Sequence, residues 1–216
     1  MTCCEAPAWV NQFDRKRAMN DLRDYRRHGP AATTTALIAA VLRAGVEDAT
    51  LLDIGGGIGA IQFALLGAGA REAVSVDASA PFLEAAREEA ARQGLASRIT
   101  FQTGDFVQVA PEIQGADIVT LDRVVCCYED WEPLVRLSAE RCRRVYGLVY
   151  PRDRRLARVV VRVQNGLRRI FRSSFRSYVH PVAAMDGLIQ SLGFRLTRTQ
   201  RTFVWEMAVY ERGQEA

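Results

Sequence analysis

Lysine, histidine and long apolar runs are scarce in this sequence of 216 residues. Lys16 is the one lysine among 29 basic residues, and histidine occurs twice. The arginine bias, together with abundant alanine, indicates GC-rich coding and a bacterial source rather than special arginine chemistry. No apolar run reaches the length of about 18 residues that a membrane-spanning helix needs, and the N-terminus lacks a basic start followed by an apolar block. We therefore expect a cytoplasmic protein.

The cysteines lack the paired spacing of structural zinc sites. They form two adjacent pairs, Cys3–Cys4 and Cys126–Cys127, with Cys142 apart from them, and no C-x-x-C occurs. Adjacent cysteines are poor partners for a disulfide with each other, and an odd count suits a reducing compartment. We predict no metal site.

Basic charge is concentrated in one segment. The net charge is only +4, yet residues 151–177 hold nine arginines and one aspartate. Apolar residues recur at helical spacing over 152–172, so this segment predicts a basic amphipathic helix. It could be a solvated surface helix, a lid over the substrate, a helix lying on anionic lipid or a nucleic-acid contact. We expect no nucleic acid, because no aromatic stacking platform or RNA-binding module is visible.

Strand and helix patterns alternate through the middle of the chain. Helices are predicted over 13–28 and 33–44, strands over 49–54, 72–79, 98–106, 116–125 and 144–150, and helices over 58–70, 80–94 and 131–143. A helix over 181–192 then precedes two strand patterns close enough to pair as a hairpin. This order predicts an α/β fold with a mostly parallel sheet covered on both faces.

The stretch LLDIGGGIGA, residues 51–60, runs from a strand into a glycine turn and a helix, an arrangement that presents backbone N–H groups to a ligand. Gly55, Gly57 and Ala60 satisfy the dinucleotide pattern G-x-G-x-x-G/A. Asp53, Gly55, Gly57 and Gly59 also satisfy D-x-G-x-G-x-G, which binds S-adenosylmethionine. Asp53 favours the second, because a carboxylate would repel a pyrophosphate and can accept a hydrogen bond from a cationic α-amino group.

Two later motifs predict contacts to a nucleoside. Asp77, followed by Ala78, ends the second strand, where an acidic residue can bind both ribose hydroxyls. The motif Gly104-Asp105-Phe106 follows the third strand. There an aspartate can accept from an adenine amino group and a phenylalanine can pack on the ring.

These motifs, together with DIVTLDRVVCCY at 117–128, resemble class I S-adenosylmethionine-dependent methyltransferases in their order and intervals. DRVVCCY is also similar to bacterial proteins labelled magnesium-protoporphyrin methyltransferase-like. The resemblance covers about residues 35–150 and 180–211. It implies a Rossmann-like seven-stranded, mostly parallel sheet with helices on both faces and an antiparallel C-terminal strand pair. It also implies the following cofactor contacts: Asp53, Gly55, Gly57, Gly59, Asp77, Ala78, Gly104, Asp105, Phe106, Leu121 and Asp122.

Catalysis of methyl transfer needs positioning above all, since the sulfonium already activates the methyl group. A general base is required only for a protonated acceptor. The titratable candidates for that role are Asp122, Tyr128 and His180. Tyr25 could fold over the cofactor or pack in the core. Cys126 and Cys127 are either inert buried thiols or ligands for a soft substrate such as trivalent arsenic, with Cys3 and Cys4 contributing.

The sequence predicts one methyltransferase domain over residues 1–216. Its parts are an N-terminal helical lid (1–46), a cofactor-binding core (47–150), a basic insertion (151–180) and a C-terminal helix and strand pair (181–216). The predicted activity is transfer of a methyl group from S-adenosylmethionine to a small molecule, leaving S-adenosylhomocysteine. Three alternatives stay open: an RNA methyltransferase, a thiol or metalloid methyltransferase using Cys126 and Cys127, and a non-methylating dinucleotide-binding protein. The acceptor atom and the oligomeric state are not predicted.

Overall fold

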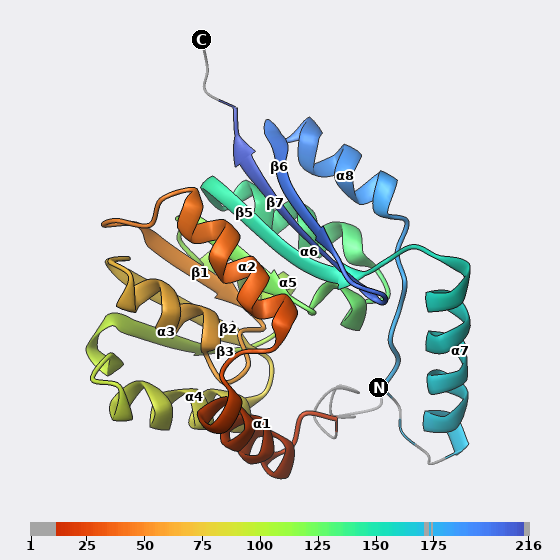
Figure 1. The fold of residues 1–216 in the computed structure, drawn as a ribbon, viewed down its shortest axis with the longest axis horizontal. Coiled ribbons are helices and arrows are strands. Elements are labelled where there is room, and N and C mark those ends of the chain that lie inside the picture. Colours follow the sequence, from red (N-terminus) through yellow and green to blue (C-terminus); the bar gives the residue numbers. More distant parts are fainter. Residues whose placement is uncertain (1–11, 171–172, 174, 214–216) are drawn as a thin grey trace.

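A single seven-stranded sheet organises the chain. The computed structural model describes residues 12–170, 173 and 175–213. The strand order across the sheet is β3-β2-β1-β4-β5-β7-β6. The strands are β1 (Thr50–Ile54), β2 (Glu72–Asp77), β3 (Ile99–Thr103), β4 (Ala116–Asp122), β5 (Cys142–Pro151), β6 (Phe194–Arg201) and β7 (Trp205–Arg212). Strands β1 to β5 are parallel, and β7 lies antiparallel between β5 and β6 (Figure 1). The predicted fold class is confirmed.

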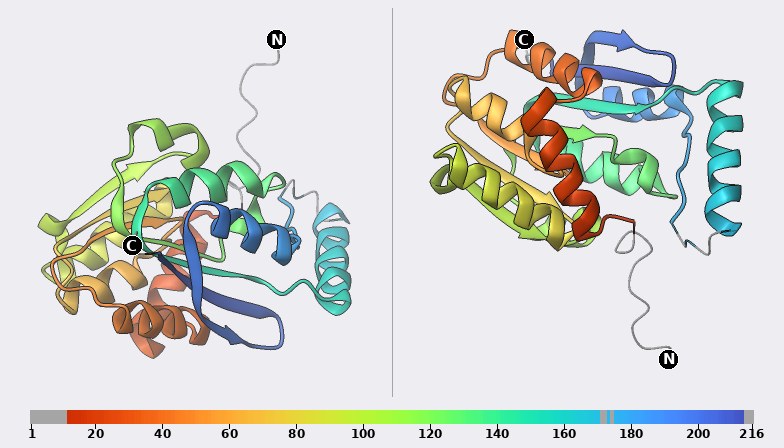
Figure 2. Two further views of the ribbon diagram at one scale, coloured as in Figure 1. Left: turned by 90° about the horizontal axis from the view of Figure 1, so that it is seen from above. Right: turned by 60° about the horizontal axis from the view of Figure 1, so that its bottom comes forward.

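Helices cover both faces of this sheet (Figure 2). One hydrophobic cluster packs α5, α6 and α8 against the sheet, and a second packs α2, α3 and α4 against the opposite face. Helix α1 lies on α4 in a smaller cluster. The helices are α1 (Arg15–His28), α2 (Ala32–Arg43), α3 (Ala60–Gly67), α4 (Ala80–Arg92), α5 (Phe106–Val109), α6 (Trp131–Glu140), α7 (Arg155–Ile170) and α8 (Val182–Ser191); short 3₁₀ turns cover Ala96–Arg98, Ala110–Glu112 and Val125–Cys127.

The central strands are mostly apolar because helices bury both of their sides. Leu51, Leu52 and Ile54 of β1 are fully buried, and the sole polar interruption of this run is the equally buried Asp53. Edge strand β6 differs, since all of its residues after Phe194 are exposed and several are charged. Charged residues on an edge strand discourage pairing with another chain.

Several predicted boundaries were wrong by two or three residues. The strands predicted over 98–106 and 116–125 end at Thr103 and Asp122, because Asp105 caps α5 and a 3₁₀ turn begins at Val125. The helix predicted over 58–70 spans Ala60–Gly67. The helix predicted over 131–143 ends at Glu140, because β5 begins at Cys142 and is longer than the predicted strand 144–150. The sequence pattern is ambiguous there, since the buried Cys142 fits either element. The basic segment does form a helix, α7, which stands beside the sheet rather than on it (Figure 1). Within the described ranges, no helix combines the length and apolarity needed to cross a membrane.

Candidate functional site

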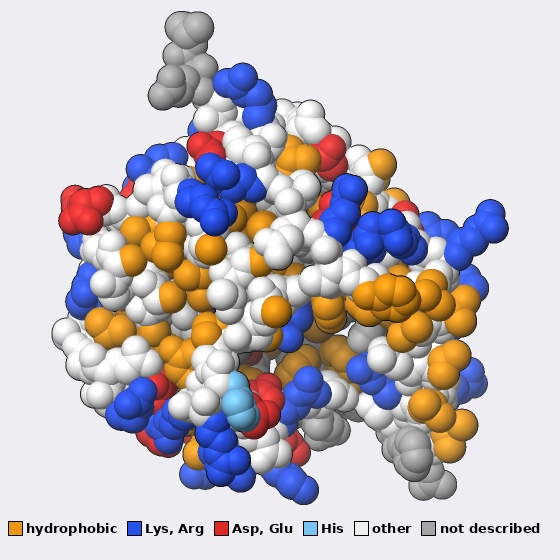
Figure 3. All heavy atoms as spheres, in the orientation of Figure 1, with side chains coloured by type: hydrophobic (Ala, Val, Ile, Leu, Met, Phe, Trp, Pro, Cys, Tyr) orange, Lys and Arg blue, Asp and Glu red, His pale blue; other side chains and the backbone are white. Residues whose placement is uncertain are grey.

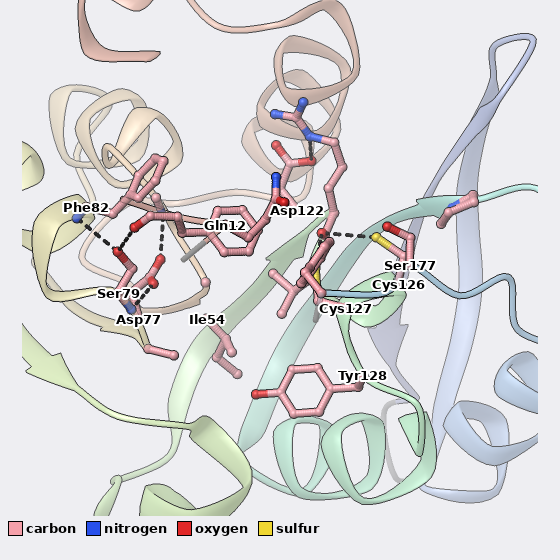
Figure 4. A pocket seen from close by; sticks show the side chains of 18 of the residues that line it. Gln12, Ile54, Asp77, Ser79, Phe82, Asp122, Cys126, Cys127, Tyr128 and Ser177 are labelled. Atoms are coloured by element: carbon pink, nitrogen blue, oxygen red, sulfur yellow. Dashed lines mark hydrogen bonds and ion pairs between the residues drawn. The ribbon is translucent and has the colours of Figure 1, made fainter. Parts of the chain in front are cut away.

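A cavity of about 550 Å³ opens at the carboxyl ends of β1, β2 and β4 (Figure 4). Ligands of open parallel sheets bind at this edge, where the chain crosses from one face to the other. The volume lies within the range of about 300–1,000 Å³ usual for small-molecule sites. Of the predicted site residues, those on the cavity wall are Gly55, Gly57, Asp77, Ala78, Gly104, Phe106, Asp122 and Tyr128; those off it are Asp53, Gly59, Asp105, Leu121 and His180.

The glycine loop after β1 is shaped by the protein's own side chains. Gly55, Gly57 and Gly59 all have positive φ values, which glycine adopts without strain. A Cβ on Gly55 would lie 2.5 Å from the Val124 side chain, and one on Gly59 would lie 2.6 Å from Phe63. Gly57 is different, because a Cβ there would make an ordinary contact of 3.6 Å with Phe82. The spacing of the glycines therefore serves internal packing as well as backbone access from the cavity.

Asp53 lies directly beneath this loop and is fully buried. Its Oδ1 accepts a hydrogen bond from the Thr120 hydroxyl at 2.7 Å, and its Oδ2 lies 3.4 Å from the Gln62 amide nitrogen. A Cβ on Gly56 would collide with this carboxylate, so the loop and the acid are in contact. Burial raises the pKa of Asp53 to about 7, and the neighbouring Asp122 and Asp77 raise it further against the hydrogen bonds that lower it. Asp53 is thus poised to ionise near neutral pH.

Asp77 faces the loop from the end of β2. Its Oδ1 accepts from the Ser79 N–H at 2.8 Å, and its Oδ2 accepts from the Gly57 N–H at 3.1 Å. Burial raises the pKa of this carboxyl group, although both backbone N–H groups oppose the shift. Each oxygen keeps capacity for a further donor such as a hydroxyl group. Figure 4 shows Asp77 and Ser79 together on the cavity wall.

The Gly104-Asp105-Phe106 motif is tied to the loop that follows β4. Asp105 caps α5, and its Oδ1 also accepts from the Tyr128 hydroxyl at 2.6 Å. Phe106 is buried and presents its side chain to the cavity. Burial and the Asp105 carboxylate raise the pKa of Tyr128 well above its ordinary value. Tyr128 is therefore a neutral donor at physiological pH and not a general base.

Asp122 ends β4 on the cavity wall. The hydroxyl of Thr34, from α2, donates to its Oδ2, and the Arg123 guanidinium lies 3.2 Å from its Oδ1. Arg123 has a φ of 61°, a left-handed conformation that is uncommon for a non-glycine residue and often marks functional loops. Leu121, by contrast, is fully buried beneath the site.

His180 does not reach the cavity. Its Nε2 lies 3.1 Å from the Val125 carbonyl oxygen, and its ring stacks on Tyr178 and tilts against Trp131. Burial lowers the pKa of His180, which favours a neutral ring donating to that carbonyl. This geometry supports a packing role and gives no route for proton transfer from a molecule in the cavity.

The adjacent cysteines do line the cavity. Both sulfurs approach the Arg123 carbonyl oxygen, Cys126 at 3.3 Å and Cys127 at 3.8 Å. Their mutual hydrogen bond, together with burial, raises the pKa of Cys126, whereas the same bond lowers the pKa of Cys127. Cys3 and Cys4 lie outside the described residues. Within the part of the chain that is described, no three His, Cys, Asp or Glu side chains cluster as a metal site would require.

The sequence predicted an N-terminal lid and offered a lid as one role for the basic segment, but it did not identify the residues of the far wall of the cavity. Helix α1 contributes Arg17 and Asp21, and α7 contributes Val161, Gln164 and Arg168. The position of α1 is consistent with the predicted N-terminal lid. Tyr25 of this helix packs on Phe63 and does not line the cavity. No local pattern marks these residues, since their meeting depends on how α1 and α7 dock.

An aromatic bridge joins the two walls. The Phe13 ring packs edge-on against Phe82 of α4 at 6.0 Å and against Phe175 at 5.5 Å, between ring centroids. The Phe13 carbonyl also accepts from the Ser79 hydroxyl at 2.7 Å. The Arg168 guanidinium lies over the Phe175 ring at 4.9 Å. The segment before α1, helix α4 and the segment after α7 thus close one side of the cavity together.

Comparisons with known proteins fit this geometry. Residues 51–145 match the family model described as a methyltransferase domain, and none of the curated proteins matches the sequence. The magnesium protoporphyrin IX methyltransferase from Synechocystis with bound SAH aligns with a TM-score of 0.72 at 21% identity, over 95% of this chain and 96% of that one. Mitomycin 7-O-methyltransferase aligns with a TM-score of 0.68 at 22% identity, over 96% and 61%.

A structure described as a putative RNA methyltransferase, from Pyrococcus horikoshii, aligns with a lower TM-score of 0.58 at 14% identity, over 83% of this chain and 82% of that one. Structural likeness at such identities concerns the fold and not the substrate. The family match and the structural matches together confirm the resemblance stated from the four sequence motifs.

Proposed function

We propose that this chain, which has the core of a class I S-adenosylmethionine-dependent methyltransferase, transfers a methyl group from that cofactor to a small molecule in the cytoplasm. The products would be the methylated acceptor and S-adenosylhomocysteine. The observation that carries the proposal is the cavity wall where the glycine loop, Asp77 and Phe106 converge at the carboxyl edge of the sheet. The three described cysteines are free thiols, which suits a reducing compartment.

The residues present fit the cofactor. The Gly57 N–H and the Asp77 carboxylate already meet through a hydrogen bond at the cavity surface, and the carboxylate can accept from ribose hydroxyl groups. Phe106 offers an apolar surface for a base. Asp105 lies beside it but off the cavity wall, where it caps α5 and accepts from the Tyr128 hydroxyl. Asp53 supplies negative charge beneath the loop once it ionises, and a cationic amino group nearby would favour that ionised form whereas a pyrophosphate would oppose it.

S-adenosylmethionine supplies a sulfonium methyl group that needs only an aligned nucleophile. The protein therefore contributes orientation, which can lower the barrier by roughly 7–11 kcal/mol. For an acceptor that arrives protonated, Asp122 is the proposed base among the three sequence candidates. Its carboxylate borders the cavity, whereas Tyr128 is held neutral and His180 lies outside.

The far wall suggests the character of the acceptor. Apolar side chains from α7 and from the start of β7 line this wall, among them Val161 and Trp205. Three guanidinium groups, those of Arg17, Arg123 and Arg168, border the cavity and outnumber the one carboxylate on this wall, Asp21. This combination suits a small molecule with an apolar body and an anionic or hydrogen-bond-accepting edge. A long nucleic acid would need a continuous basic track with stacking aromatics instead.

Isothermal titration calorimetry with S-adenosylhomocysteine and with NAD tests the proposal. We expect binding of the first and not of the second. Asp77→Asn should weaken S-adenosylhomocysteine binding by about tenfold or more, because a charge-assisted hydrogen bond contributes roughly 1.5–3 kcal/mol. Tight binding of NAD with no binding of S-adenosylhomocysteine would refute the proposal in favour of the dinucleotide alternative.

A further inference from the structure

Helix α7 turns most of its apolar side to solvent, and Val160, the least exposed residue of that side, also borders the cavity. Six large aliphatic side chains on it are 36–74% exposed, and they make up two thirds of the nine exposed large hydrophobic residues described. We call this set the α7 apolar face: Leu156, Val159, Val160, Val163, Leu167 and Ile170. At 100° per residue the six positions span a single stripe about 100° wide. A helix of a globular protein normally buries such a stripe against the core.

The inner side of α7 is held by polar contacts instead. The Asn165 amide donates to the Ser177 carbonyl at 2.8 Å and accepts from the Ser177 N–H at 3.0 Å. Arg168 donates to the Ser177 hydroxyl at 2.7 Å, and Ala157 is the buried residue of the helix. The orientation of α7 is thus fixed by hydrogen bonds that leave the apolar stripe on the outside.

Arginines border the α7 apolar face along one margin. Arg155, Arg158, Arg162 and Arg169 are exposed and share the helix face adjacent to the stripe. The one acidic residue of the whole 151–177 segment, Asp153, is already paired with Arg158. Figure 3 shows hydrophobic side chains gathered over this part of the surface, with Lys and Arg side chains around them.

A further exposed apolar side chain, at the tip of the β6–β7 hairpin, lies near the start of α7. Phe203, at the β6–β7 turn, is 74% exposed. Its turn is tied to the segment leading into α7, because the Arg152 N–H donates to the Val204 carbonyl at 2.8 Å and the Arg152 guanidinium donates to the Thr202 carbonyl at 3.0 Å. Both views of Figure 2 and that of Figure 1 place the hairpin tip beside this segment.

The charges around the stripe identify what would cover it. A second copy of this chain would bring arginine against arginine across an isologous contact, with no free acid in the segment to offset them. A nucleic acid would pair with the arginines and leave six aliphatic side chains in water. An anionic bilayer satisfies both properties, because its acyl region accepts the aliphatic stripe and its headgroups attract the guanidinium groups.

We propose that the α7 apolar face and its arginine margin dock this protein on the surface of an anionic phospholipid bilayer. The helix would lie in the plane of the interface, with the stripe below the headgroups and the arginines among them. Its inner side lines the cavity, so docking would bring the cavity close to the bilayer. The inference concerns a surface and does not depend on the proposed methyl transfer.

Vesicle co-sedimentation of the full chain tests this proposal. We expect binding to vesicles of phosphatidylcholine mixed with phosphatidylglycerol, weaker binding in high salt, and little binding to phosphatidylcholine alone. Arg162→Gln with Arg169→Gln should lower the partition coefficient roughly thirtyfold, since each arginine near the surface contributes about fivefold. The matched control, Arg195→Gln with Arg198→Gln, removes equal charge from exposed positions of β6 and should bind as the wild type does.

The apolar requirement is tested by Val163→Gln with Leu167→Gln. Both side chains are at least half exposed and neither lines the cavity, so the melting temperature should not fall. We expect this variant to lose binding about tenfold or more even on the anionic vesicles. Wild-type levels of binding by it would show electrostatic adsorption only and would overturn the proposal. The proposal would also be overturned if the wild type did not bind the vesicles, or if the β6 control lost as much binding as the α7 arginine variant. A dimer in analytical ultracentrifugation that these two substitutions abolish would overturn it as well.

Discussion

The buried carboxylate beneath the glycine loop should cost the free protein stability. Burial raises the pKa of Asp53 from its ordinary value of 3.8 to about 7, so the folded state binds a proton more tightly than the unfolded chain does. Stability then falls as the pH rises from 3.8 to about 7 and stays low above that. Asparagine has the same shape and does not titrate. Asp53→Asn should therefore stabilise the protein at alkaline pH relative to acidic pH.

The size of this effect follows from the pKa. Between pH 5 and pH 8 the wild type should lose about 2–3 kcal/mol of unfolding free energy through this group, at about 1.4 kcal/mol per pH unit. Asp53→Asn should be free of that loss. Comparing the two proteins at both pH values cancels the pH-independent effect of replacing one side-chain oxygen with nitrogen. Urea unfolding followed by circular dichroism at pH 5 and pH 8 measures the difference.

Asp117 provides a control of opposite sign in the neighbouring strand. Burial alone would raise its pKa, but the Thr50 N–H and hydroxyl, at 2.9 and 2.8 Å, lower it overall. Asp117→Asn should therefore lose stability at pH 8. If Asp53→Asn and wild type respond identically to pH, the buried carboxylate carries no such cost and our account of the site is wrong. If the prediction holds, weaker binding of S-adenosylhomocysteine by Asp53→Asn would show that this destabilising buried carboxylate is retained for cofactor binding.

Three further results are expected. The Glu89 side chain is fully buried where α4 meets α1. Hydrogen bonds, first from Arg92 and then from Gln93 and Arg26, lower its pKa from 4.5 to about 2, so the stability that Glu89 contributes is present above pH 4.5 and is lost as the pH falls towards 2. Glu89→Gln should therefore lower the free energy of unfolding by about 2–3 kcal/mol at pH 7, as measured by urea unfolding. The Tyr128 hydroxyl donates to a carboxylate, so Tyr128→Phe should cost roughly 1.5–3 kcal/mol, and an unchanged stability would contradict that hydrogen bond. Cys127 should react with iodoacetamide at neutral pH before Cys126 does, because its pKa is the lowered one; peptide mapping that finds the reverse order would refute this assignment.

The sheet and one wall of the cavity were predictable because short-range patterns determine them. Short, mostly apolar runs identify β1 and β4, and the residues that follow each parallel strand necessarily gather at one edge. Asp77 and Phe106 were found on that basis. The interpretation of the glycines was incomplete, because Gly55 and Gly59 make room for Val124 and Phe63, which no spacing rule foretells.

The remaining parts of the site depend on tertiary contacts that local patterns do not encode. His180 carries a typical catalytic side chain, yet its ring is held by a backbone carbonyl outside the cavity. Arg123 adopts a positive φ directly after β4, where its N–H donates to the Val149 carbonyl of β5, and no local pattern predicts this conformation for an arginine. The amphipathic pattern of α7 was visible in the sequence, but which of its faces would point outward was not.

The two walls of the cavity therefore have different consequences for specificity. The wall at the sheet edge is built from strand ends and a backbone loop, whose geometry the core fixes. The opposite wall is built from α1 and α7, which lie outside the sheet. Helix α1 packs on α4 through Leu22 and the Arg26–Glu89 ion pair, and α7 is held to the segment that follows it by the Ser177 hydrogen bonds. Substitutions on α1 or α7 can change the shape and charge of that wall without disturbing the glycine loop. Acceptor choice is thus expected to reside in Arg17, Gln164 and Arg168 rather than at the sheet edge.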